Sequence, residues 1–153
     1  MTDIVDRQTR SRIMSRIGGR DTKPEIAVRS GLHRLGFRFS LHRKDLPGKP
    51  DIVLPAYQTV IFVHGCFWHC HQGCDYFRMP KSNKRFWKKK LLGNRKRDQK
   101  NIDLLLREGW FVAVVWECLI RDRTDEQIGG AVLRVGEWVA RTKYKRRRVE
   151  FST

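Results

Sequence analysis

Residues 60–74 read VIFVHGCFWHCHQGC, and this stretch decides how the rest of the chain is interpreted. Its first four residues are apolar and three of them are β-branched, which favours a buried strand. From His64 onward the pattern changes to histidines, cysteines and aromatic rings. Seven of the nine His and Cys residues of the chain lie between His64 and Cys74 or at Cys118. The stretch therefore predicts a buried strand that ends in a loop rich in metal-binding and catalytic side chains.

Further helices and strands are predicted on both sides of this stretch. Thr22 can cap a helix that begins with Pro24 in its first turn and runs to about Leu35. The other expected elements are strands at 37–41, 52–54 and 110–116, helices at 82–92 and 94–107 separated by Gly93, and a helix from Thr124 to about Ala140. This order predicts an α/β fold in which helices flank a mixed sheet.

Charge and composition indicate a folded protein that binds a polyanion. The chain has 153 residues, a net charge of +17 and 40% hydrophobic residues, enough apolar matter for one folded domain. We expect an N-terminal arm at 1–20, a main domain at 21–140 and a basic tail at 141–153. Residues 81–100 hold ten basic and one acidic side chain, and residues 141–150 hold six and one. Such runs attract phosphates, so nucleic acid is the favoured partner.

The cell compartment is predicted from what the sequence does not contain. There is no apolar run of about 18 residues and no basic and apolar leader at the N-terminus. We therefore expect a cytoplasmic protein without a membrane partner. In that setting the four cysteines are more typical of metal ligands or reduced thiols than of disulfides.

The cysteines suggest a structural zinc site. Zinc takes four tetrahedral ligands, and Cys66, His71, Cys74 and Cys118 can supply a Cys₃His set that ties the loop to a distant strand. Cys70 competes with His71, which leaves a Cys₄ set as an alternative. Buried or merely reduced thiols are the third interpretation.

The polar residues near the strand ends suggest phosphodiester hydrolysis. A nuclease needs a carboxylate for Mg²⁺, a base for water and a donor for the phosphate. Asp51 supplies the carboxylate at a strand entrance, while His64 and His69 remain if other side chains hold zinc. Glu25 is a further candidate carboxylate. Asp51, Glu25 and His64 each also have a purely structural interpretation, since Asp51 follows a turn, Glu25 fits a helix cap and His64 ends a strand.

Two apolar pairs lie where burial is not the obvious explanation. Phe67 and Trp68 are adjacent in the polar loop, and such rings can wedge between base pairs, most easily at a mismatch. The alternative is a small core beneath the zinc loop. Met14 and Ile17, on a short helix expected at 11–17 of the arm, are a second apolar probe or simply dock on the body.

Several of these strings resemble the very short patch repair (Vsr) DNA mismatch endonucleases. The matching segments are 9–11 with Met14 and Ile17, 22–25, 46–51, 60–69 and 109–118. The resemblance implies a restriction-endonuclease-like fold and nicking of the T-containing strand at T·G mismatches that arise from deamination of 5-methylcytosine. In that family a Phe-x-His arrangement, here residues 62–64, replaces the usual acidic and Lys motif.

The resemblance also implies roles by position. Asp51 and the carbonyl of Val63 would bind Mg²⁺, His69 oriented by Glu25 would activate water, and His64 would contact the phosphate. Phe67 and Trp68 would intercalate between bases, and Met14 and Ile17 would press from the opposite groove. The zinc ion would be held by Cys66, His71, Cys74 and Cys118. Val63 stands where the family has Thr, which a carbonyl ligand tolerates. An apparent insertion at Gly73, and Cys70 in place of a histidine, leave His71 and Cys70 as rival zinc ligands.

The implied partners are mismatched double-stranded DNA, mismatch-repair proteins and a repair polymerase at the bacterial nucleoid. One active site suffices for a nick, so we expect a monomer. With one obvious carboxylate, we expect little Mg²⁺ affinity without DNA. Two other functions stay open: a restriction-type endonuclease that cuts both strands, and a zinc-containing DNA-binding protein without catalysis.

Overall fold

The computed structural model describes residues 6–9, 20–141 and 147–153, with helices packed on a five-stranded sheet. The strand order is β1 (Ser40–Leu41), β2 (Ile52–Leu54), β3 (Thr59–His64), β4 (Phe111–Trp116) and β5 (Arg148–Phe151). The first three strands pair antiparallel and the last three pair parallel. The α/β class with a mixed sheet is therefore confirmed. Met14, Ile17 and the arm helix lie outside the described residues.

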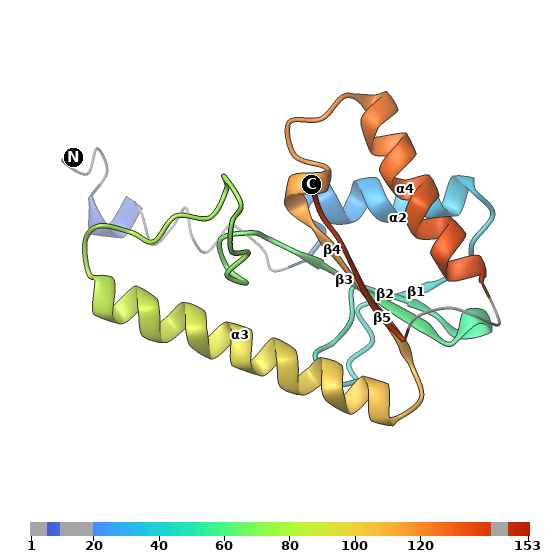
Figure 1. The fold of residues 1–153 in the computed structure, drawn as a ribbon, viewed down its shortest axis with the longest axis horizontal. Helices are drawn as coiled ribbons and strands as arrows, with labels where there is room; N and C mark the ends of the chain where they lie inside the picture. Colours follow the sequence, from blue (N-terminus) through green and yellow to red (C-terminus); the bar gives the residue numbers. More distant parts are fainter. Residues whose placement is uncertain (1–5, 10–19, 142–146) are drawn as a thin grey trace.

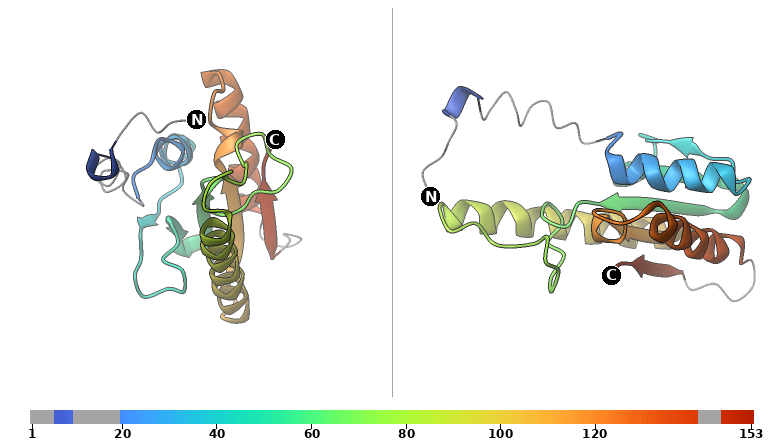
Figure 2. Two further views of the ribbon diagram at one scale, coloured as in Figure 1. Left: turned by 90° about the vertical axis from the view of Figure 1, so that its left-hand side faces the viewer. Right: turned by 90° about the horizontal axis from the view of Figure 1, so that it is seen from above.

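Helices cover both faces of this sheet, as Figure 1 shows. Helices α2 (Lys23–Arg34) and α4 (Asp125–Ala140) lie on one face, and α3 (Lys84–Arg107) lies on the other. Figure 2 shows that the N-terminal half of α3 extends past the sheet, alongside the loop that follows β3. Within the described part of the chain, no helix has the length and apolar character needed to span a bilayer.

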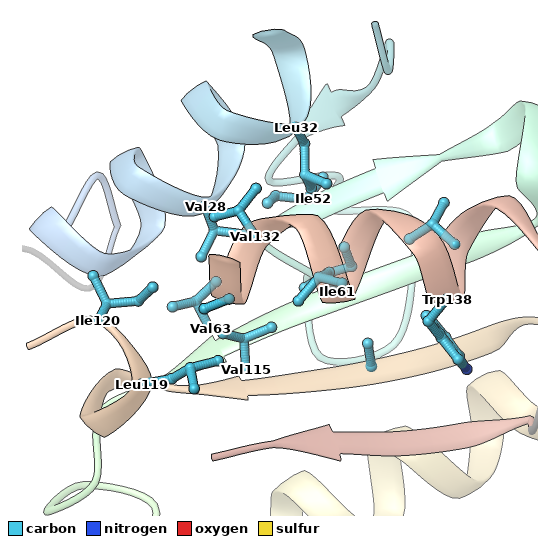
Figure 3. Packing of buried hydrophobic residues seen from close by; sticks show 14 of the residues in the cluster. Val28, Leu32, Ile52, Ile61, Val63, Val115, Leu119, Ile120, Val132 and Trp138 are labelled. Carbon is cyan, nitrogen blue, oxygen red and sulfur yellow. The ribbon is translucent and has the colours of Figure 1, made fainter. Parts of the chain in front are cut away.

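Alternation along the central strand explains the two layers. Ile61 and Val63 of β3 pack with Val28 and Leu32 of α2 and with α4, whereas Val60 and Phe62 pack on the α3 side. Figure 3 shows the first of these clusters from close by. Because β3 is buried along its whole length, its end carries His64 into the interior beside the loop.

The helix starts agree with the sequence at two places. The Thr22 hydroxyl accepts from the backbone N–H of Glu25, so α2 begins as expected. Thr124 and Gln127 form a reciprocal capping box at the start of α4. Both caps are local interactions, which is why the sequence identifies them.

The prediction was wrong about the helix that follows the loop. Instead of two helices separated by Gly93, α3 is one helix of 24 residues whose N-cap is Asn83 rather than Ser82. A glycine inside a helix costs about 1 kcal/mol. Burial of Leu91 and Ile102, on either side of the glycine, offsets that cost by packing against the body.

The strands also differ from expectation at both sheet edges. Of the strand predicted at 37–41, only Ser40 and Leu41 pair with β2. Conversely, residues 148–151 of the expected basic tail form β5, in parallel register with β4. Val149 and Phe151 pack toward the α2 and α4 side, so the end of the chain joins the core.

Candidate functional site

Four of the residues singled out from the sequence line one cavity of about 500 Å³ at the end of β3: Asp51, Val63, His64 and His69. Asp51 directly precedes β2, and the antiparallel pairing of β2 with β3 brings it beside Val63. Three cations, Arg20, Lys44 and Lys49, and three residues of α3, Asp98, Asn101 and Ile102, also line the cavity, as does His42. Two carboxylates, three imidazoles and three cations therefore surround one space.

Asp51 is held at the bottom of this space. Its Oδ2 accepts a hydrogen bond from the backbone N–H of Val63 at 2.7 Å, and its side chain is 15% exposed. Burial, together with the nearby Glu25 carboxyl, raises the pKa of Asp51 to about 7. The surroundings of Asp51 therefore favour either a proton or a cation at this carboxylate.

Glu25 lies behind Asp51, with His42 beside both. Glu25 is 2% exposed, and its Oε2 accepts from the backbone N–H of Asp21 at 2.9 Å. His42 Nε2 lies 3.6 Å from Glu25 Oε2, and His42 Nδ1 lies 3.8 Å from Asp51 Oδ1. The backbone of His42 has φ 49°, an unusual conformation for a residue with a side chain. An imidazole thus sits between the buried carboxylate of Glu25 and the half-buried carboxylate of Asp51.

The two histidines of the loop stack on each other. The rings of His64 and His69 are 3.8 Å apart and 4° from parallel. His69 Nδ1 lies 2.6 Å from Asp98 Oδ2, so Asp98 orients His69. Glu25, which the family resemblance pairs with His69, instead contacts Asp21 and His42 in this structure.

His64 is buried and neutral. Burial, followed by repulsion from His69 and from Arg148, lowers the pKa of His64 well below its usual range. A neutral imidazole still has one N–H donor and one acceptor nitrogen. His64 can therefore donate a hydrogen bond toward the cavity without carrying charge.

A second polar cluster contains Cys66, His71, Cys74 and Cys118, whose donor atoms all lie within 4.8 Å of one another. His71 Nδ1 is 3.4 Å from Cys66 Sγ and 3.6 Å from Cys118 Sγ. Ligand atoms around a tetrahedral zinc ion lie about 3.5–3.8 Å apart, so this donor set fits the ion in both chemistry and spacing. Cys70 is buried but lies outside the cluster. The structure thus favours His71 over Cys70 as the fourth donor.

Burial affects the protonation of this donor set. Burial lowers the pKa of His71. Burial also raises the pKa of the Cys66 thiol, and repulsion from the neighbouring Cys118 and Cys74 sulfurs raises it further. The His71 ring also stacks on Trp116, with ring centroids 4.1 Å apart. A neutral imidazole and closely packed sulfurs are the surroundings in which a soft divalent cation is stabilised.

Aromatic rings form a third group at the N-terminal half of α3. Phe67 and Trp68 of the loop contact each other at 5.1 Å between centroids, and each contacts Trp87 of α3, at 5.6 and 6.0 Å. Lys90 Nζ lies 5.5 Å from the Trp68 ring centroid. We call Phe67, Trp68 and Trp87 the aromatic cluster. Its rings are half-buried against one another and remain partly accessible from outside.

Three residues of these groups were missed in the sequence: Asp98, His42 and Trp87. Asp98 had a signal, because it is the one acidic residue among ten basic ones at 81–100. His42 and Trp87 had none, since only the fold brings them to Asp51 and Trp68. One contact that holds α3 against the loop is the hydrogen bond that Asn94 Nδ2 donates to the carbonyl of Trp68.

Comparisons with known proteins agree on one group of relatives. The family model described as DNA mismatch endonuclease Vsr matches residues 2–75. The type II nicking enzyme V.XorIIP of Xanthomonas oryzae is 52% identical over 122 residues, which cover 80% of this chain and 89% of the relative. The DNA mismatch endonuclease Vsr of Escherichia coli is 42% identical over 142 residues, 91% of this chain and 88% of the relative.

Proposed function

Because this chain belongs to the Vsr family of DNA mismatch endonucleases, we propose that it nicks the T-containing strand at T·G mismatches left by deamination of 5-methylcytosine, with Mg²⁺ as cofactor. The chain is a DNA endonuclease, and the mismatch and the cofactor are the proposal. The observation that carries it is that Asp51, His64 and His69 line one cavity, and that the loop which carries His69 also carries Phe67 and Trp68. The mixed sheet with helices on both faces is consistent with a restriction-endonuclease-like fold.

Asp51 and the carbonyl oxygen of Val63 would hold Mg²⁺. Both offer the oxygen atoms that this ion prefers, and the raised pKa of Asp51 marks surroundings that favour positive charge. When bound, the ion supplies Lewis-acid polarisation of the phosphate and stabilises the leaving oxygen. One carboxylate is a weak site, so DNA phosphate oxygens would complete it and we expect Mg²⁺ affinity without DNA to be low.

The imidazoles carry the proton and the phosphate contact. His69 accepts a proton from water, and Asp98 at 2.6 Å fixes the ring and stabilises the imidazolium that forms. His64, buried and neutral, donates its N–H to a phosphate oxygen. Arg20, Lys44 and Lys49, on the rim of the cavity, attract the DNA backbone.

The aromatic cluster would separate the bases next to the mismatch. Inserting a ring costs a few kcal/mol of stacking, and least where pairing is already weak. Phe67 and Trp68 are partly accessible, and Trp87 supports them from α3. Met14 and Ile17 would act from the opposite groove.

The Cys₃His cluster would hold a structural zinc ion. It joins the loop at Cys66, His71 and Cys74 to Cys118 in the 3₁₀ turn after β4. The same loop carries His69 and the Phe67 and Trp68 rings of the aromatic cluster, so the ion would fix the geometry of the site. The further partners we propose are mismatch-repair proteins and a repair polymerase, with this chain acting as a monomer at the bacterial nucleoid.

A panel of labelled duplexes tests the proposal. Each duplex carries T·G, another mismatch or no mismatch in varied flanking sequence, and the strand and position of each cut are recorded with Mg²⁺. We expect one nick in the T strand of T·G duplexes. Cuts in both strands of a matched sequence would indicate a restriction-type enzyme, and binding without cleavage in any divalent metal would indicate a DNA-binding module.

A further inference from the structure

A second cavity, of about 180 Å³, adjoins the first and has no role in the proposed function. The two cavities share His64, His69, Asp98 and Ile102. The other walls of the smaller one include Arg95 and Gln99 of α3 and Arg148 and Glu150 of β5. The last strand of the chain therefore brings an arginine next to the histidines of the cleavage site.

Arg148 is held in a fixed place before any DNA binds. Its Nη1 donates to Gln99 Oε1 at 3.0 Å and its Nη2 donates to Glu150 Oε1 at 3.0 Å. The other oxygen of Glu150 accepts from Trp116 Nε1 at 3.1 Å. In parallel register with Val112, Arg148 opens β5 on the α3 side of the sheet. A guanidinium that is already oriented loses less entropy when it binds a ligand.

The carboxylates of this cavity are engaged, whereas Arg148 keeps donors to offer. Both oxygens of Glu150 accept hydrogen bonds, and Asp98 is paired with His69. A guanidinium has five N–H donors in a fork that matches phosphate geometry, and two hydrogen bonds do not exhaust them. The Arg148 side chain is 34% exposed, so a ligand can reach it.

We propose that Arg148, with Arg95 beside it, binds the DNA phosphate next to the one that is cleaved. The inference rests on the proposed function, because it takes the scissile phosphate to lie beside His64 and His69. Phosphates follow one another along a strand at about 3.4 Å of helix axis per nucleotide. A cavity that adjoins the cleavage cavity through shared histidines therefore receives the neighbouring phosphate of the same strand.

This assignment gives the C-terminal strand a task in the endonuclease. Val149 and Phe151 anchor β5 in the core. Arg148, which lies between β5 and α3, then fixes the position of the bound DNA strand. A phosphate held on each side of the stacked imidazoles limits sliding of the scissile bond past His69. Arg148 acts by binding the backbone and reads no base.

Salt dependence of binding tests this subsite without requiring cleavage. Affinity for a T·G duplex is measured without divalent metal over a series of salt concentrations, for wild type, Arg148→Ala and Arg134→Ala. Arg134 is an exposed arginine on α4, on the opposite face of the sheet, so its removal deletes the same charge elsewhere. Removing one cation that pairs with a phosphate flattens the slope of log K against log salt by about 0.9. We expect that change for R148A alone, with a several-fold decrease in affinity.

A scan of single neutral phosphates locates the phosphate that Arg148 binds. Each phosphate near the mismatch is replaced in turn by a methylphosphonate, and the affinity of wild type should fall at the cleaved position and at one adjacent position. R148A should be insensitive to the replacement at the adjacent position only. If R148A lowers the melting temperature, Arg148→Gln replaces it in the scan, because glutamine retains a long polar side chain that supports β5 without the positive charge.

The outcomes separate this inference from the proposed function. Equal slopes for R148A and R134A, or an unchanged methylphosphonate pattern in R148A and R148Q, would overturn the subsite even if T·G nicking is observed. If nicking at T·G fails but R148A alone is insensitive to the methylphosphonate at the adjacent position, the phosphate subsite stands and only the mismatch assignment falls.

Discussion

The two polar clusters to which the loop after β3 contributes residues have opposite construction. Cys66, His71, Cys74 and Cys118 have their donor atoms within 4.8 Å of one another, whereas Asp51, His64 and His69 line an open space of about 500 Å³. Closed donor sets suit structural ions, and open ones leave room for water and substrate. The loop after β3 thus connects a closed donor set, which suits a structural ion, to an open cavity, which has room for water and substrate.

The largest effect should come from the open cluster. Asp51→Asn keeps the size of the side chain but removes the charge that, in the proposed function, would hold Mg²⁺, so cleavage of a T·G duplex should fall by about 10³-fold or more. Affinity for DNA without metal should stay within a few-fold. Asp45→Asn, an exposed carboxylate paired with Arg43 before the same turn, is the matched control. Comparable activity of D51N and D45N would remove Asp51 from the mechanism.

The closed cluster should respond in stability before activity. Cys118→Ser removes one donor, and we expect purified protein to lose its zinc on dialysis and its melting temperature to fall by roughly 10 °C, as for a destabilisation of about 3 kcal/mol. Cys70→Ser is the control, because Cys70 is buried outside the cluster. Elemental analysis and thermal melts check both. Zinc released from C70S and retained in C118S would support a different donor set.

Between the clusters, Asp98 should matter through His69. Asp98→Asn retains a hydrogen bond but no longer stabilises the imidazolium, so kcat should fall by about 10²-fold with unchanged DNA affinity. Single-turnover rates against pH are the measurement, with Glu108→Gln at the exposed end of α3 as the control. A D98N enzyme with the wild-type rate and pH profile would make the 2.6 Å interaction between Asp98 and His69 purely structural.

The aromatic cluster should affect choice of substrate more than rate. Trp68→Ala should reduce the preference for mismatched over matched duplex by about 10-fold, since ring insertion is most favourable at weak pairs. Phe86→Ala removes a ring that is 58% exposed and contacts Trp87, so its effect should be smaller. Competition between the two duplexes gives the ratio. Equal decreases in both variants would contradict insertion by the loop rings.

The smallest effect is a pH-dependent change in stability at Asp51. Its pKa of about 7 lies above the ordinary aspartate value of 3.8, so the wild type should become less stable as pH rises from about 4 to 7. D51N lacks this titration and should be more stable than wild type by roughly 1–3 kcal/mol at pH 8 and equal at pH 4. Metal-free melts at both pH values measure it. A constant difference would mean that Asp51 ionises normally in the folded protein.

Much of the fold could be predicted because its signals are local. The Thr22 and Thr124 caps and the apolar runs of β3 and β4 each act within a few residues. The continuity of α3 through Gly93 and the pairing of β5 were missed because tertiary packing decides both. The residues of β5 include Arg148 and Glu150, whose strand conformation depends on β4 beside them.

The sequence identified the chemistry-bearing residues of the loop, together with Asp51 and Cys118 at strand ends, but not the side chains that contact them from other elements. His64, His69 and the Cys₃His set lie close in sequence or carry a recognisable spacing. Asp98, His42 and Arg148 reach the same cavities from α3, the turn before β2 and the last strand. Such contacts depend on how distant elements pack, and no sequence window contains them.

In the proposed function, Asp51 and the stacked imidazoles of His64 and His69 cut one strand beside a mismatch. Single-turnover cleavage of a T·G duplex with both strands labelled differently tests it most directly, using wild type and D51N with Mg²⁺. We predict a single cut in the T strand for wild type and a rate lower by about 10³-fold in D51N. Cleavage of both strands, or equal cleavage of the matched duplex, would contradict it.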